Sequence, residues 1–167
     1  MKNYQVKFTG TAPLLIGKFI VTKTGTRKPQ DIPVDEMLHK NEQGQIGLPN
    51  RNILFCIRDG ASRVIERQRT TYKKTILGLI GINEDFIVLS PQKYDVYTRP
   101  LRRGNGERIL VNNPMFKNWS LGFTVTVDDD LSLETFMEIL EKAGKMYGLG
   151  VFRTGGFGRF TYEIGEI

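Results

Sequence analysis

The sequence is poor in cysteine, histidine and tryptophan, with one of each among its 167 residues. The single cysteine, Cys56, excludes an internal disulfide and a cysteine metal cage. Nothing in the sequence predicts a bound metal or another cofactor. No apolar run approaches the roughly 18 residues of a membrane helix, and no apolar segment follows the N-terminal charge as in a signal peptide. We therefore expect a cytoplasmic protein without a membrane partner.

Composition and charge favour a folded domain with a polyanionic partner. Hydrophobic residues make up 40% of the chain and charged residues 25%, which is typical of a globular protein. The length is that of one domain, so we predict a single domain over residues 1–167. The net charge of +6 attracts phosphate-rich partners. Basic residues gather in 18–28, 51–74 and 99–108, whereas acidic residues gather in 128–141. The domain is expected to have a basic and an acidic side.

The spacing of apolar residues predicts an α+β fold. Strict alternation predicts strands, and helical spacing predicts helices. The expected strands are 4–9, 86–98 (interrupted by Pro91), 121–128 and 160–164, and the expected helices are 50–67 and 132–147. This β-α-β-β-α-β order is typical of ferredoxin-like, RNA-recognition-like domains, whose helices cover one face of the sheet. The other face stays open, and RNA-recognition domains stack bases there on aromatic side chains. Residues 10–47 form a long loop insertion after the first strand.

The second helix carries clear signals at both ends. Ser132 is expected to cap its start by accepting a backbone N–H bond, with Leu131 packing onto Phe136. Gly148 is expected to end it.

The most informative segment is the glycine-rich stretch 148–160, between the second helix and the last strand. Glycine lets backbone approach a ligand closely, so its N–H groups are expected to wrap phosphates while arginines supply charge and phenylalanines stack on bases. The candidate binding residues here are Gly150, Arg153, Gly155, Gly156, Phe157, Gly158 and Arg159. A flexible connection is the alternative. A Rossmann or P-loop site needs glycines after a strand and before a helix, which is the reverse order.

Two segments resemble the RAMP superfamily, the repeat-associated proteins that form backbone and processing subunits of CRISPR effector complexes. Residues 155–160, Gly-Gly-Phe-Gly-Arg-Phe, resemble the end of its C-terminal glycine-rich loop. Residues 47–58 resemble the entry to its first helix, with Arg58 at the position of the closing arginine. Residues 50–52 and Leu54-Phe55 depart from that pattern. The resemblance implies binding of RNA or single-stranded DNA by this helix, which includes Arg51, and by the loop, together with self-association or sister protein subunits.

A basic excursion follows the second expected strand. Four arginines surround a Gly-Asn-Gly turn, namely Arg99, Arg102, Arg103 and Arg108. They predict a hairpin that clamps phosphates by charge rather than by sequence, and a solvated hairpin tip is the alternative. Tyr97 beside it is a candidate for base stacking or for the core. The charge runs 18–28 and 67–74 are interpreted as a mobile loop and a solvated face, with phosphate binding as the alternative for each.

The sequence gives little support for catalysis. His39 suits general acid–base chemistry of the ribonuclease kind, and Asp35 loosely matches the cutting aspartate of type III backbone subunits, but both suit an ordinary polar loop. No Ser/His/Asp order, CxxC pair or HExxH helix is present. Our first prediction is a backbone-binding protein for RNA or single-stranded DNA in a nucleoprotein assembly. A small RAMP-type endoribonuclease, or a protein-interaction subunit that has lost nucleic-acid binding, is the alternative.

Overall fold

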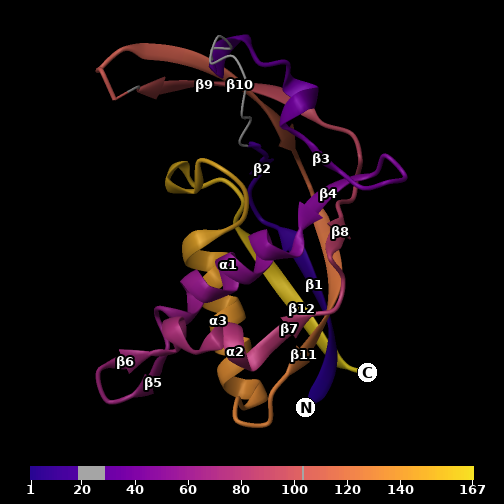
Figure 1. Cartoon of the computed structure of the whole chain (residues 1–167), viewed down its shortest axis with the longest axis vertical. Helices are drawn as coiled ribbons and strands as arrows, with labels where there is room; N and C mark the ends of the chain where they lie inside the picture. The colour runs from indigo at the N-terminus through magenta and orange to yellow at the C-terminus, as the bar shows by residue number, and fades with distance from the viewer. Residues whose placement is uncertain (19–28, 103) are drawn as a thin grey trace.

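The computed structural model describes residues 1–18, 29–102 and 104–167, so Arg103 and most of the basic run 18–28 lie outside the described part. The chain has an α+β fold, as predicted. Its largest sheet contains β1 (Lys2–Gly10), β7 (Ile80–Ile82), β11 (Ser120–Val127) and β12 (Phe160–Glu166) in the antiparallel order β12-β1-β11-β7. Helices α1 (Asn50–Ala61) and α3 (Leu133–Lys142) cover one face of this sheet (Figure 1). The expected strands 4–9, 121–128 and 160–164 are confirmed.

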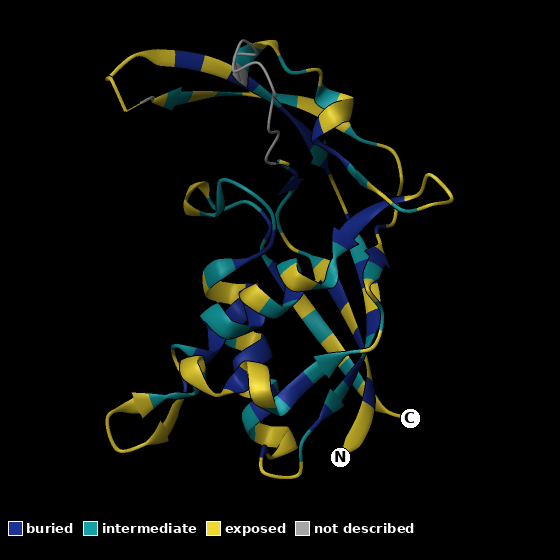
Figure 2. Cartoon of the chain, viewed as in Figure 1, coloured by how far each residue is buried: buried dark blue, intermediate teal, exposed yellow. Residues whose placement is uncertain are grey.

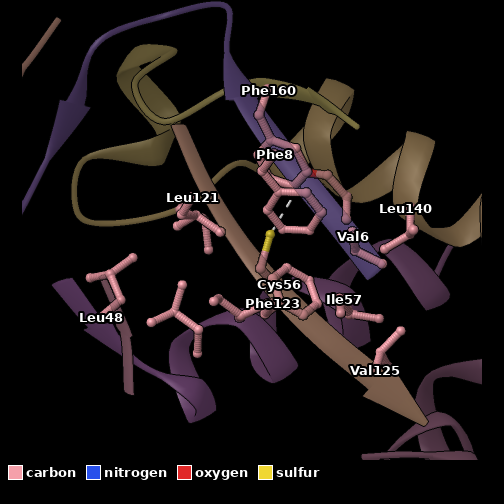
Figure 3. Close-up of a cluster of buried hydrophobic side chains, with 14 of the residues drawn as sticks. Val6, Phe8, Leu48, Cys56, Ile57, Leu121, Phe123, Val125, Leu140 and Phe160 are labelled. Carbon is pink, nitrogen blue, oxygen red and sulfur yellow. Dashed lines mark hydrogen bonds between the residues drawn. The ribbon is translucent and has the colours of Figure 1, made fainter. Parts of the chain in front are cut away.

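The core lies between the sheet and the two helices. Alternation along β1 buries Tyr4, Val6 and Phe8. Phe8 stacks on Phe160 with ring centroids 4.0 Å apart and meets Phe123 edge-on at 5.1 Å. Figure 3 shows these rings gathered around the side chain of Cys56, which α1 contributes. Apolar burial of this kind is the main driving force for folding, and it fixes which face of each strand meets the helices.

The opposite face of this sheet is polar. The pairing of β1 with β11 and β12 aligns Gln5, Lys7 and Thr9 with small or polar neighbours. Those neighbours are Ser120, Gly122, Thr124, Thr161, Glu163 and Gly165. None of these side chains is aromatic, so this face lacks the stacking platform that RNA-recognition domains use.

The expected second strand, 86–98, is wrong as a member of this sheet. Residues 80–82 form β7, which pairs with β11 at the sheet edge. Its three residues include Gly81 and follow a single helical turn, α2 (Ile76–Leu79). A strand this short cannot display alternation, so its sequence gives no strand signal.

The segment 86–98 contributes to two other sheets. Its first part is β8 (Phe86–Val88), which pairs with β4 (Ile46–Pro49) beside β3 (His39–Lys40). Its second part begins β9 (Asp95–Arg102), which pairs with β10 (Arg108–Phe116). The hairpin predicted from the arginines of residues 99–108 is thus confirmed as β9–β10, although it is longer than the arginine run.

The first helix ends six residues earlier than predicted, at Ala61 rather than residue 67. The Ser62 hydroxyl donates a hydrogen bond to the Asp59 carbonyl at 2.6 Å and closes this end. Residues 65–67 form β5 (Ile65–Arg67), which pairs with β6 (Thr70–Thr71) through a turn in which Gln68 has a φ of 50°. Ile65 fitted the helical spacing, but its side chain is 69% exposed.

The start and the end of the second helix agree with the sequence. The Thr135 N–H donates to the Ser132 hydroxyl at 3.2 Å, and Leu131 and Phe136 are both buried. After Lys142 the helix widens into a π-helical turn, η4 (Ala143–Tyr147), and Gly148 ends it with a φ of 80°.

The described parts of the insertion after β1 support the β9–β10 hairpin. It contributes β2 (Leu14–Leu15), which pairs with β10, and the short 3-10 turns η1 (Pro29–Asp31) and η2 (Val34–Met37). Met37 packs with Ile109 and Val111 in a second apolar cluster beneath the hairpin. The hairpin thus projects from one end of the molecule, and its tip is exposed (Figure 2). No helix among the described residues has the length and apolar character that a membrane crossing requires.

Candidate nucleic-acid interface

The glycine-rich segment is a hydrogen-bonded loop rather than a flexible connection. The Leu149 N–H donates to Gly158 O at 2.9 Å, and the Val151 N–H donates to Leu15 O at 2.9 Å. A Cβ on Gly158, whose φ is 77°, would lie 1.9 Å from Leu149 O, and one on Gly150 would lie 2.1 Å from Leu15 O. Glycine is required there because two backbone segments pass too closely for any side chain.

The expectation that this loop wraps phosphates with its N–H groups needs correction. The N–H groups of Gly155, Gly156 and Gly158 donate to Phe152 O, Arg153 O and Pro13 O at 2.8–3.0 Å. These donors are used within the protein. In this conformation, contacts to a phosphate therefore depend on side chains rather than on these glycines.

The aromatic residues of the loop join it to the hairpin. Phe157 lies between Phe152, at 5.6 Å between ring centroids, and Tyr97 of β9, at 5.0 Å. The Arg99 guanidinium lies over the Phe152 ring at 5.4 Å. Aromatic pairs and cation–π contacts at such distances are attractive. The sequence suggested the glycine-rich loop and the β9–β10 hairpin as separate binding elements, but their side chains pack against each other. Phe157 is half-buried in this contact.

Arg99 is held by a residue that the sequence analysis missed. Its Nε donates to Asn113 Oδ1 at 2.8 Å, and Asn113 Nδ2 donates to Ile16 O at 3.1 Å. Burial lowers the pKa of Arg99, although a guanidinium stays protonated at neutral pH. Asn113 is 1% exposed. Its signal in the sequence was an asparagine at an inward position of an otherwise apolar strand.

A cavity of about 320 Å³ lies between α1 and the glycine-rich loop. Arg58 lines it, and the Nε of this arginine is buried without a hydrogen-bond partner among the described residues. The Arg58 guanidinium lies 4.6 Å from the centroid of the Phe55 ring, and that of Arg51 lies 5.5 Å from it. Residues 51, 55 and 58 share one stripe of the helix. The signal for this stripe in the sequence was Phe55, an aromatic side chain among charges on the polar face of the helix.

Arg153 contributes to the same cavity but is already paired. Its Nη1 lies 2.9 Å from Asp59 Oδ2, which connects the glycine-rich loop to α1. Arg159 lies beside it, since its Nη2 donates to Arg153 O at 3.4 Å. The Nη1 of Arg159 is buried without a partner in the described structure, and this residue lines a separate groove with Lys145 and Thr161.

Arg102 and Arg108 of the hairpin are not among the residues that line this cavity. Arg102 of β9 and Arg108 of β10 lie opposite each other in the strand register near the hairpin tip, and both are exposed. Arg103 lies outside the described residues.

Only one of the two catalytic candidates reaches the cavity. His39 is half-buried in its wall, and burial together with the charge of Lys18 lowers the His39 pKa, so the imidazole is neutral at pH 7. Asp35 is exposed on η2 and is not among the residues that line the cavity. The described residues contain no cluster of three or more His, Cys, Asp and Glu side chains that could hold a metal ion.

Comparison with known proteins identifies a structural relative but no family. No family model matches the sequence, and no curated protein matches it. Among solved structures, the chain is similar to one chain in the cryo-EM structure of the Type III-B Cmr-beta complex bound to cognate target RNA, with a TM-score of 0.52 and 14% identity. The similarity covers 99% of this chain and 60% of that one. At this level of identity the relationship is one of fold.

Proposed function

We propose that this chain binds RNA or single-stranded DNA through the sugar–phosphate backbone, as a single-domain, ferredoxin-like relative of the RAMP superfamily. The observation that carries the proposal is the buried Nε of Arg58, which has no hydrogen-bond partner among the described residues and belongs to the cavity beside Phe55. A buried donor without an acceptor is uncommon in native proteins. A phosphate oxygen supplies that acceptor with a charge-assisted bond.

The topology supports the finer assignment of fold. In the order β12-β1-β11-β7, α1 follows β1 and α3 follows β11 along the chain. This is the arrangement of a split βαβ unit. The two segments that resemble RAMP motifs, 47–58 and 148–160, also meet in space, because the Asp59–Arg153 pair connects them directly beside the matched Arg58.

The chemistry of the site suits a ligand recognised by its charge and its flat bases. Guanidinium groups hold phosphates in a planar fork, and Phe55, which is 37% exposed, offers a face on which a base can stack. The proposed contacts are Arg51, Phe55, Arg58, Arg99, Arg153 and Arg159, with Arg102, Arg103 and Arg108 reaching the strand from the hairpin. The loop residues Gly150, Gly155, Gly156, Phe157 and Gly158 give this surface its shape.

The proposal includes an assembly. The related solved chain belongs to a complex bound to target RNA, and we propose that this chain likewise acts with copies of itself or with sister subunits on one nucleic-acid strand. RNA is the first ligand to test, because it is the ligand named for that complex.

The test is fluorescence-anisotropy titration of labelled single-stranded RNA, single-stranded DNA and duplex with the wild type and an Arg51→Gln, Arg58→Gln variant. Each phosphate contact contributes about 0.7 to the magnitude of the slope of log K against log salt for single strands. The slope for the variant is therefore expected to be smaller in magnitude by about 1.4. A Lys2→Gln, Lys7→Gln variant removes the same charge from β1 and is the control. Absence of binding to all three ligands at low salt would contradict the proposal and favour the protein-interaction subunit.

A second candidate function, RNA cleavage, is favoured by the position of His39 in the cavity with Arg58 and Asp59. A neutral imidazole can take the proton of a 2′-hydroxyl, whose oxygen then attacks the adjacent phosphorus and displaces the 5′-oxygen. The 5′-oxygen takes a proton from water, so the products are a 2′,3′-cyclic phosphate and a 5′-hydroxyl. His39→Ala is expected to abolish cleavage and retain binding, whereas Asp35→Ala retains both. Cleavage lost only in Asp35→Ala would assign the chemistry to η2 instead, and an uncut RNA would exclude this function.

A further inference from the structure

The strand pair β5–β6 and the turn after it form a second concentration of positive charge. We define the basic hairpin as residues 63–74, with the cations Arg63, Arg67, Arg69, Lys73 and Lys74 and the single carboxylate Glu66. Glu66 accepts a hydrogen bond from the Thr75 hydroxyl at 3.0 Å. Within the described ranges none of the five cations forms an ion pair. All five are exposed, so a partner of opposite charge can reach them.

The basic hairpin is attached to the end of α1. The Arg63 Nε donates to the Tyr147 hydroxyl at 2.9 Å, and the Ser62 hydroxyl lies 2.9 Å from the same oxygen. The Val64 carbonyl accepts from the Tyr72 N–H at 3.1 Å and closes the base of the hairpin. Its position relative to the helix is thus fixed by side-chain and backbone contacts.

Helix α1 leads from the cavity to this hairpin. Residues 51, 55, 58 and 62 lie on one stripe of the helix, so the line of Arg51, Phe55 and Arg58 continues into Ser62 and Arg63. Figure 1 shows the glycine-rich loop, α1 and the β5–β6 strands one after another along the same side of the molecule. The charges of the basic hairpin therefore lie beyond the end of the arginine stripe and extend it.

We propose that the basic hairpin is a second phosphate-contacting element for the same single strand, so that the backbone of the strand runs along α1 from the cavity to residues 63–74. This rests on the function proposed above. It goes further by giving the nucleic-acid strand a path along α1, a second contact and a minimum length. Acidic protein surfaces would also suit these cations, but the continuity with the stripe on α1 favours nucleic acid.

The helix sets that minimum length. Arg51, the proposed contact farthest from the hairpin, lies at the start of the helix, whose 12 residues span roughly 18 Å at about 1.5 Å per residue. A stacked strand advances about 3.4 Å per nucleotide, so about five nucleotides are needed to bridge the two contacts. Shorter strands reach only one of them.

The test compares an Arg67→Gln, Arg69→Gln variant with the wild type and with the Lys2→Gln, Lys7→Gln control, on single-stranded RNA of about 4 and about 15 nucleotides. Both substitutions lie in an exposed strand pair, and an unchanged thermal midpoint verifies folding. For the long RNA the variant is expected to lose about 1.4 from the salt slope, which is roughly 25-fold in affinity between about 1 M and about 0.1 M salt. For the short RNA it is expected to match the wild type.

Three outcomes would overturn the inference. If the wild type binds the long RNA and the variant has the same affinity and slope, the hairpin does not contact the strand, while the proposed function stands. If the variant keeps its RNA affinity but changes the sedimentation of the protein without RNA, the hairpin contacts protein instead. If the wild type binds neither RNA, the proposed function fails together with this inference.

Discussion

The guanidinium of Arg153 donates a hydrogen bond to the carboxylate of Asp59 at 2.9 Å and so attaches the glycine-rich loop to α1. Arg58, the residue before Asp59, has a buried Nε with no acceptor in the described structure. The two arginines of this cavity thus have different roles. The pairing of Arg153 with Asp59 maintains the shape of the cavity, whereas the Arg58 Nε is the donor that we propose a ligand satisfies.

The Asp59–Arg153 pair is expected to contribute to stability. A double-mutant cycle with Asp59→Ala and Arg153→Ala should give a coupling free energy of about 1 kcal/mol, because solvent screens a pair that is partly exposed. Urea unfolding of the four proteins measures this term. A coupling of zero would mean that the pair does not hold the loop on the helix.

Two glycines of the loop are expected to respond differently to alanine. Gly158→Ala places a Cβ 1.9 Å from Leu149 O, whereas Gly156→Ala meets nothing within 4 Å. Both residues have a positive φ, so Gly156→Ala should cost about 1 kcal/mol of unfolding free energy, and Gly158→Ala about 3 kcal/mol because overpacking adds to the backbone strain. Chemical denaturation compares them. Equal costs would contradict the close approach of the two backbone segments.

Asn113 is expected to keep the β9–β10 hairpin in a fixed position on the rest of the protein. Replacing it with leucine removes the acceptor of Arg99 Nε and the donor to Ile16 O, which should cost about 1–3 kcal/mol. Limited proteolysis should then cut the hairpin faster. Asn113→Asp retains an acceptor for Arg99 and is the matched control. If both variants resist the protease as the wild type does, Arg99 is held by other contacts.

Ionisation of Cys56 is expected to make the unfolding free energy depend on pH in the alkaline range. Burial raises the pKa of this thiol to about 12 from 9.0, and the thiol donates a hydrogen bond to Gly148 O. Above about pH 9 the unfolded chain loses this proton while the folded chain keeps it, so the unfolding free energy should fall by about 1.4 kcal/mol per pH unit. Below that pH the effect is absent.

A Cys56→Ser variant isolates this effect, because serine does not ionise. The difference in unfolding free energy between wild type and variant should be constant from about pH 7 to 8.5 and should shrink above about pH 9. A difference that does not change with pH would mean that the native thiol ionises as readily as the unfolded one.

Much of the fold could be predicted because its signals are local. A few residues are enough to predict a strand with clean alternation, such as 121–128. The same holds for a helix that begins at a serine cap and ends at a glycine. Strand β7 could not be predicted, since its three residues depend on pairing with β11 for their conformation. The end of α1 was missed because Ile65 fits the helical spacing although it points to solvent.

The site was predicted only as a set of segments. Sequence motifs singled out the glycine-rich loop, Arg58 and the arginine hairpin, but which arginine is free depends on tertiary contacts. Asp59 pairs with Arg153 across 94 positions of the chain, and Asn113 reaches Ile16 across 97. No local pattern encodes such contacts. The roles of the loop glycines were misjudged for the same reason, because their close neighbours are remote in sequence.

The most direct test of the account is the affinity of single-stranded RNA for the wild type, Arg58→Gln and Arg153→Gln across a salt series. We predict that Arg58→Gln weakens binding equally for unrelated sequences and lowers the salt slope by about 0.7, with an unchanged unfolding free energy. Arg153→Gln is predicted to lower stability as well as affinity. Binding by Arg58→Gln with the affinity and the salt slope of the wild type would contradict the account.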